Sequence, residues 1–218
     1  MIFFGENFNL FIRGLFMKII ILGAGGKIGS EIVQALSPKH EIVRAGRNDD
    51  VKVDYTDAQS VKNMFEQVGG FDALIVAVGG DSVFKVYEEL SNEDFAYGFQ
   101  RKFMAQVNLV RTGTSFANDG ASFTLSTGYL SDYPNPASAA TGPFNAAVDS
   151  FVRTVGPILP RGIRLNVVSP APVVSPGEAG RGVVTAKQAA VGYVQSIEGT
   201  MNGEVLRMWG GLENEPRR

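Results

Sequence analysis

Cysteine is absent from the 218 residues of this chain, and histidine occurs only once. Without thiols the chain forms no disulfide, supplies no thiolate nucleophile and offers no thiolate metal ligands, so we expect no metal centre. The single histidine, His40, lies where a helix is expected to end and a strand to begin. This position predicts a surface loop residue rather than a catalytic base, and a hydrolase that uses serine and histidine is therefore disfavoured.

An excess of one sign of charge is also missing, because 22 acidic residues balance 20 basic ones and the net charge is −2. A chain without a basic field binds a phosphate polymer poorly, so we expect no nucleic-acid partner. No apolar run is long enough to span a membrane, so we expect a soluble, cytoplasmic protein without a membrane partner. The length and the apolar content of 44% are those of one globular domain.

The first sixteen residues differ from the rest of the chain. They are rich in Phe, Leu and Ile, but polar residues interrupt them and no small-residue cleavage site follows. Met17 stands directly before the first strong strand pattern. We predict that residues 1–16 form an extension outside the fold, with an arm that packs on a neighbouring subunit as the alternative, and that residues 17–218 form one domain.

Short runs of strand-forming residues alternate with amphipathic helical patterns throughout this domain. The run KIIIL at residues 18–22 and the run ALIVAV at residues 73–78 are typical of buried parallel strands. Helical crossovers between such strands predict a three-layer α/β fold of the Rossmann type, with a doubly wound, mainly parallel sheet of about seven strands. The expected strands are 18–22, 41–45, 51–53, 73–78, 121–125, 163–168 and 204–208, and the expected helices are 27–36, one capped by Thr56 or Asp57, one capped by Ser91, 99–116, 144–155 and 185–197.

The segment between the first strand and the first helix is rich in glycine. Gly23, Gly26 and Gly29 have the spacing G-x-x-G-x-x-G at the start of a βαβ unit. One glycine permits the tight turn, one lets the backbone approach a pyrophosphate, and one lets the helix pack closely on the strand. The N-terminus of the helix then offers N–H groups to the phosphates, so we predict a bound nicotinamide dinucleotide rather than a flexible turn without a ligand. The cofactor-binding residues expected in this loop are Gly23, Gly25, Gly26, Lys27, Ile28 and Gly29.

The end of the second strand indicates which dinucleotide is bound. An acidic residue at this place binds the ribose hydroxyls of NAD, whereas an arginine accommodates the 2′-phosphate of NADP. Arg47 and Asn48 stand here, and we expect Arg47 to form a charge-assisted hydrogen bond with the phosphate. The alternative is a surface arginine that pairs with Asp49 or Asp50. We therefore predict NADP as the cofactor, with NAD possible.

Several motifs, in order along the chain, resemble those of the short-chain dehydrogenase/reductase family. The glycine loop is similar to the family's T-G-x-x-x-G-x-G, with Leu22 in place of the threonine and Lys27 in place of the middle glycine. The segment DYTD at residues 54–57 resembles D-[VL]-[ST]-D, and RLNVVSP at residues 164–170 resembles I-R-V-N-x-V-x-P. The segment AVGG at residues 77–80 occupies the place of the family's N-A-G.

This resemblance implies an oxidoreductase that transfers hydride between the cofactor and a carbonyl or alcohol carbon of a small-molecule substrate. It also implies a homo-oligomer, either a dimer or a tetramer. The resemblance places further cofactor contacts after the third, fourth and sixth expected strands, at Asp54 and Tyr55 near the adenine, at Ala77, Val78 and Gly79, and at Pro170, Val173 and Ser175 near the nicotinamide.

The catalytic residues of the family are not all present. Its members use Asn, Ser and the pair Y-x-x-x-K, in which the tyrosine exchanges a proton and the lysine lowers the tyrosine pKa and holds the ribose. Here NAAV at residues 145–148 matches K-A-A-V, which places Asn145 at the lysine and Thr141 at the tyrosine. Lys102 stands at the position of the asparagine, and Ser126 or Thr127 at that of the serine.

Three interpretations stay open at this point. In the first, the reaction is rebuilt around an inward-pointing Lys102, with Tyr129 or Tyr133 as the acid and Ser126 or Thr127 bonding the substrate oxygen. In the second, the protein is a catalytically inactive, NADP(H)-binding redox sensor or regulator. In the third, the domain is mainly an assembly partner through the apolar face of the helix at 144–155.

The segment before that last helix carries a structural signal. Pro134, Pro136 and Pro143 exclude a regular helix before about Gly142, and Pro143 fits the first helical turn. Thr141 or Gly142 is then the expected N-cap, which gives Thr141 a structural reason to be present.

Overall fold

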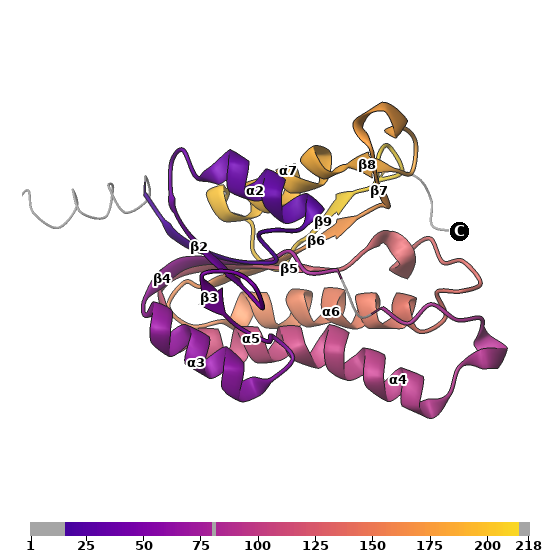
Figure 1. Ribbon diagram of the computed structural model, residues 1–218, viewed down its shortest axis with the longest axis horizontal. Helices are drawn as coiled ribbons and strands as arrows, with labels where there is room; N and C mark the ends of the chain where they lie inside the picture. The colour runs from indigo at the N-terminus through magenta and orange to yellow at the C-terminus, as the bar shows by residue number, and fades with distance from the viewer. Residues whose placement is uncertain (1–15, 80–81, 214–218) are drawn as a thin grey trace, which may run out of the picture.

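The structure is a computed structural model that describes residues 16–79 and 82–213, and these form three layers (Figure 1). A parallel sheet of seven strands lies in the middle, with α2 and α7 on one face and α3, α5 and α6 on the other. The predicted doubly wound fold is confirmed. The extension predicted for residues 1–16 lies almost wholly outside the described residues and stays a prediction.

The strand order is β3-β2-β1-β4-β5-β6-β9, and a second sheet pairs β7 with β8. The chain winds outward from β1 in one direction and from β4 in the other, so a crevice opens where the carboxyl ends of these two strands diverge. The elements are β1 Lys18–Leu22, α2 Lys27–Leu36, β2 Glu41–Gly46, β3 Val51–Lys52, α3 Ala58–Val68, β4 Phe71–Val76, α4 Asn92–Gly98, α5 Ala105–Gly113, β5 Ala117–Ser126, α6 Thr141–Val155, β6 Arg164–Pro170, β7 Val173–Val174, β8 Val184–Thr185, α7 Ala186–Glu198 and β9 Val205–Met208.

Two separate cores hold the layers together. On one face of the sheet, Ile19 and Ile21 of β1 pack with α2 and α7, and on the other face Ile20 and Leu22 pack with α3, α5 and α6. Because side chains alternate along a strand, the run KIIIL buries apolar groups on both faces, as a central parallel strand requires. The main chain at the end of β1 is thereby fixed, and this is where the glycine loop begins.

Helix capping follows the sequence at most of the expected places. Asp57 caps α3 by accepting a hydrogen bond from the Ser60 N–H (2.6 Å), and Ser91 forms a capping box at the start of α4. The cap predicted for α6 at Thr141 or Gly142 is wrong. Its N-cap is Ala140, because the hydroxyl of Thr141 donates instead to the Val83 carbonyl (2.8 Å) in a distant loop.

The single helix expected at 99–116 is also wrong in detail, because the chain forms a π-helix at Phe99–Met104 between α4 and α5. The Ala105 N–H bonds to the Gln100 carbonyl, five residues earlier. The Gln106 side chain then donates to the Lys102 carbonyl (3.0 Å) and to the Ser126 carbonyl (3.0 Å), and it accepts from the Ser126 N–H (2.9 Å). One buried glutamine therefore ties the π-helix to the carboxyl end of β5.

His40 is not the surface residue that its position predicted, since only 7% of it is exposed. Its Nδ1 accepts a hydrogen bond from the Met17 N–H (3.3 Å), and its Nε2 lies 3.5 Å from the Glu198 carboxylate. Both neighbours approach from elsewhere in the chain, which a local reading of the sequence cannot anticipate. His40 precedes β2 and so lies at the amino edge of the sheet, opposite the crevice.

In residues 16–79 and 82–213, no helix combines the length and the apolarity needed to cross a membrane.

Candidate cofactor and active site

Two adjoining cavities lie at the carboxyl edge of the sheet. The larger, of about 540 Å³, is lined by residues at or after the ends of β1, β2, β3 and β4 and by one residue of the π-helix. The smaller, of about 320 Å³, is lined by residues of the π-helix and α6 and by those that follow β5 and β6. Gly79 lines both cavities, so they meet at the end of β4. An elongated ligand with two chemically different halves fits this arrangement.

The glycine loop has the geometry of a phosphate cradle. Gly23 has a φ of +81°, and a Cβ there would lie 2.6 Å from the Ala77 carbonyl oxygen. A Cβ on Gly29 would lie 2.0 Å from the Gly23 carbonyl oxygen, so this glycine is what allows α2 to start so close to β1. A Cβ on Gly25 would meet nothing within 4 Å, because this residue faces the larger cavity.

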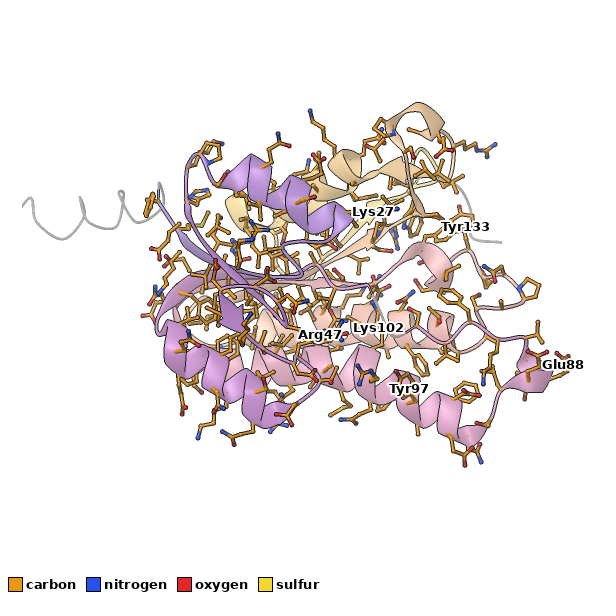
Figure 2. The ribbon with its side chains drawn as sticks, in the orientation of Figure 1. Lys27, Arg47, Glu88, Tyr97, Lys102 and Tyr133 are labelled. Carbon is orange, nitrogen blue, oxygen red and sulfur yellow. The ribbon has the colours of Figure 1, made fainter. Side chains whose placement is uncertain are left out.

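The N-terminus of α2 points its free N–H groups at this cavity. Gly26 is the N-cap and, having no side chain, leaves the first turn without a side-chain cap. Gly23, Gly25 and Gly26 line the cavity, whereas Lys27 is exposed at the start of α2 (Figure 2) and Ile28 packs against an apolar cluster around Ala171. The uncapped N–H groups and the dipole of α2 make this end of the cavity suitable for a pyrophosphate.

The other end of the larger cavity carries the residues expected to meet the adenosine. Arg47 and Asn48 follow β2, and Asp54 and Tyr55 follow β3, and all four line the cavity. Arg44, not Arg47, is the arginine whose side chain approaches Asp49 (3.9 Å). The positions of the predicted residues therefore fit an adenosine whose ribose lies beside the end of β2.

Asp54 is held in its ionised form. Its carboxylate accepts hydrogen bonds from the Thr56 hydroxyl (2.7 Å) and the Thr56 N–H (3.0 Å), and these lower its pKa below the usual value. The positive charges of Arg101 and Arg47 lower the pKa of Asp54 further. A carboxylate in this state can accept a hydrogen bond from an amino group of a ligand.

The smaller cavity brings together four of the five candidate catalytic residues. Lys102 comes from the π-helix, Thr127 follows β5, and Thr141 and Asn145 lie on α6. The fifth, Ser126, does not line this cavity. Its hydroxyl donates to the Val76 carbonyl and is 2.5 Å from the Tyr193 hydroxyl, on the opposite face of the sheet from Lys102. Of the two residues that the sequence left open at this position, Thr127 is the one that lines the smaller cavity.

Lys102 points inward and is only 6% exposed. Burial lowers its pKa to about 8, because the desolvated ammonium is less stable than the neutral amine, and the negative charge of Asp149 opposes this shift. Burial also raises the pKa of Asp149, which accepts hydrogen bonds from the Thr127 hydroxyl (3.0 Å) and the Ser131 hydroxyl (3.4 Å). The cavity wall thus holds a buried ammonium, which feels the charge of Asp149, and the Thr127 hydroxyl, which is hydrogen-bonded to Asp149.

The other candidate polar side chains differ in whether they line the smaller cavity and whether they are already hydrogen-bonded. Asn145 donates to the Gly128 carbonyl (3.2 Å), and Thr141 donates to the Val83 carbonyl (2.8 Å). Tyr129 lines the cavity, whereas the Tyr133 hydroxyl donates to the Leu212 carbonyl (3.3 Å) and Tyr133 is outside the lining. Of the two tyrosines considered as an acid, Tyr129 is the one within the cavity.

The nicotinamide contacts implied by the family motif are only partly assembled. Pro170 lines the smaller cavity, and Val78 and Gly79 line the larger, next to it. Ala77 holds the loop by donating its N–H to the Leu22 carbonyl (2.8 Å). Val173 and Ser175 line neither cavity, because Val173 packs in an apolar cluster and Ser175 is exposed at the start of a 3-10 turn, Pro176–Glu178.

Three residues of the site were missed by reasoning from the sequence. Arg101 lines the larger cavity, Asp149 connects to Thr127, and Gln106 fixes the π-helix. Asp149 lies one turn after Asn145 on α6, and this spacing could have indicated that Asp149 belongs to the site. Nothing in the hydrophobic pattern marks a π-helix, so no comparable indication pointed to Arg101 or Gln106.

The fold and the paired cavities define a dinucleotide-binding α/β protein of the Rossmann class. A family model described as enoyl-(acyl carrier protein) reductase matches residues 19–198, and a search of curated proteins found no match. The chain is similar to the protein lin1944 from Listeria innocua, with 36% identity over 88% of this chain and 100% of that one and a TM-score of 0.82. It is also similar to a small-chain dehydrogenase solved in complex with NADPH, with 26% identity over 89% of this chain and 97% of that one and a TM-score of 0.80. This chain belongs to the short-chain dehydrogenase/reductase family.

Proposed function

We propose that this protein is an NADP(H)-dependent oxidoreductase that interconverts a carbonyl and an alcohol with an altered set of catalytic residues. The observation that carries the proposal is the meeting of the two cavities at Gly79, with the phosphate cradle in one and Lys102, Thr127 and Asn145 in the other. A nicotinamide placed between them would face these three side chains.

The residues present fit the cofactor. Gly25, Gly26 and the start of α2 would hold the pyrophosphate, Arg47 the 2′-phosphate, and Asp54 the adenine. The NADPH complex of the small-chain dehydrogenase supports this assignment. When bound, NADPH supplies the hydride.

A lysine and an asparagine have exchanged places relative to the family pattern. The motif matches assign Asn145 to the family's lysine position and Lys102 to its asparagine position, and both residues line the same cavity from different helices. An ammonium group is therefore still available in the cavity, but it comes from the π-helix rather than from α6. We propose that Lys102 takes over the electrostatic part of the missing lysine's work.

The reaction would use the following groups. The Thr127 hydroxyl, just after β5, would turn its proton from Asp149 to the substrate oxygen, and the ammonium of Lys102 would stabilise negative charge as it develops on that oxygen. Tyr129 is the lining residue with a phenolic proton to give, since Thr141 is already bonded to a backbone carbonyl. The apolar remainder of the lining, which includes Phe84, Leu130 and Pro172, would exclude water from the reacting atoms.

The test of this function is a screen of aldehydes and ketones with the purified protein and NADPH. We expect loss of NADPH absorbance with at least one carbonyl compound, and a single turnover when enzyme exceeds NADPH. Stoichiometric binding of NADPH without oxidation by any compound in the panel would instead support a redox sensor. The engaged hydroxyl of Thr141, in the place of the family's tyrosine, is the observation that favours this second candidate.

Replacing Arg47 tests the choice between NADP and NAD. Arg47→Ala removes a guanidinium that lines the adenosine end of the cavity, so NADPH binding should weaken by about 1.5–3 kcal/mol while NADH binding changes little. Calorimetric titration with both cofactors measures the two losses separately. Equal losses for NADPH and NADH would remove Arg47 from the 2′-phosphate site.

A cytoplasmic homo-oligomer, dimer or tetramer, stays a prediction. The exposed aromatic side chains near the start of the π-helix, Tyr97 and Phe99, support a subunit contact on that side of the molecule.

A further inference from the structure

The π-helix places two consecutive basic residues in two different cavities. Arg101 lines the larger cavity and Lys102 the smaller. The proposed reaction uses Lys102 and the proposed cofactor preference uses Arg47, so Arg101 has no role in either. Its position nevertheless borders the same space as Asp54, Tyr55 and Val78, at the adenosine end of the cavity.

The order of the strands indicates which part of a dinucleotide lies near Arg101. The pyrophosphate belongs at α2, after β1, and the ribose at the end of β2, so the base beyond the ribose belongs at the end of β3. Asp54 follows β3, and Arg101 acts on its carboxylate more strongly than Arg47 does. Arg101 is therefore at the base end, while Arg47 is at the ribose end.

The side chain of Arg101 is already held in place. Its Cζ lies 5.3 Å from the ring centroid of Tyr97, one helical turn earlier, and it is half-buried. Figure 2 shows Tyr97 on α4, on the same side of the sheet as Lys102. A guanidinium ordered in this way loses little freedom when a flat aromatic ligand binds beside it, and its plane matches such a ligand better than an ammonium does.

We propose that the planar guanidinium of Arg101 stacks on the adenine ring of the dinucleotide, as a second arginine with a role distinct from that of Arg47. Arg101 borders the cavity beside Asp54, which follows β3, whereas Arg47 follows β2, so we place Arg101 at the base rather than at the 2′-phosphate. This inference rests on the proposed function only in requiring that the larger cavity binds an adenine dinucleotide.

The two arginines then differ in a way that binding measurements detect. Arg101→Met should weaken the binding of NADPH and of NADH by the same factor, about tenfold, which is the usual size of one base-stacking contact. Arg101→Lys should show a similar loss, because it keeps the charge but not the planar group. Arg47→Met should weaken NADPH alone.

The experiment is calorimetric titration of each variant with NADPH and with NADH. Arg111→Met is the matched control, because Arg111 is exposed on α5 and lines neither cavity, and it should bind both cofactors as the wild type does. Thermal unfolding without cofactor should give the same midpoint for all variants that are compared.

Four results would overturn the proposal. A loss confined to NADPH in Arg101→Met would assign Arg101 to the phosphate, and full affinity in Arg101→Lys would assign it a purely electrostatic role. Unchanged affinity in Arg101→Met, with a wild type that binds NADPH, would end the proposal and leave the proposed function intact. A wild type that binds neither cofactor would end both.

Discussion

Lys102→Met is expected to lower the turnover of any substrate of this protein by about 10²–10⁴-fold, while the affinity for NADPH stays the same. Among the described residues that line the smaller cavity, Lys102 carries the only cationic group. Methionine has a similar length and fits a buried site, so the change removes the charge and little else. Single-turnover oxidation of NADPH measures the chemical step, and calorimetry measures the binding.

This variant should also be at least as stable as the wild type. The ammonium of Lys102 is buried, and burial disfavours a charged group, so replacing it by an apolar side chain removes an unfavourable contribution to folding. Lys85→Met is a suitable control, since Lys85 is an exposed lysine paired with Asp94 (2.8 Å). Full turnover in Lys102→Met would contradict the role of this lysine and would leave Tyr129 and Thr127 to carry the reaction alone.

The pH dependence of the wild type provides a second check on the same lysine. Turnover should fall as the pH rises through about 8, because the Lys102 ammonium loses its proton there. Asp149→Asn should move this fall to lower pH, since the carboxylate raises the pKa of Lys102. The pKa of Lys102 is about 8 in the folded chain and 10.5 in the unfolded chain, so between these pH values the folded chain has lost the proton and the unfolded chain still holds it. The penalty for burying the charge is then relieved, and the free energy of unfolding rises with pH across this range.

Gly29→Ala is expected to destabilise the fold by about 3 kcal/mol and to abolish cofactor binding, because the added Cβ would lie 2.0 Å from the Gly23 carbonyl oxygen. The atom that it meets is backbone, which cannot turn aside, so α2 must move away from β1. The N–H groups at the start of α2 then leave the position from which they face the cavity. Thermal unfolding and NADPH titration report the two effects.

Gly25→Ala should affect cofactor binding without affecting the stability of the fold. A Cβ at Gly25 meets no atom within 4 Å, and its φ is not in the left-handed region, so this variant should fold as the wild type does. The methyl group would enter the space proposed for the pyrophosphate, and NADPH affinity should fall by about tenfold or more. If Gly29→Ala bound NADPH normally, or Gly25→Ala unfolded, the assignment of these two glycines would be incorrect.

Much of the fold followed from local patterns. The buried run at β1, the bounds of α2 and the cap at Ser91 are determined by residues close in sequence and were predicted, and Asp57 is one of the two caps predicted for α3. The errors arose where a distant contact decides the outcome. Thr141 or Gly142 was expected to cap α6, but the Thr141 hydroxyl bonds to the carbonyl of Val83, 58 residues away, and the N-cap is Ala140.

Part of the candidate site was also predictable from the sequence. Motif spacing identified Lys102, Thr127 and Asn145 as residues of one site, and they line one cavity. The choice between Ser126 and Thr127 depends on which face of β5 each side chain takes, and therefore on the register of a buried strand. Arg101 could not be assigned at all, because its direction depends on the π-helix.

That π-helix restricts how this part of the chain can vary in length. In an α-helix one residue corresponds to a turn of about 100°, so a deletion between Phe99 and Met104 that restored regular winding would rotate everything on one side of it by that amount. Arg101 and Lys102 would then leave their cavities together, and Gln106 would lose its place beside Ser126. Relatives that use this site should therefore differ from the present chain here by substitution, and tolerate insertions and deletions in the loops on either side.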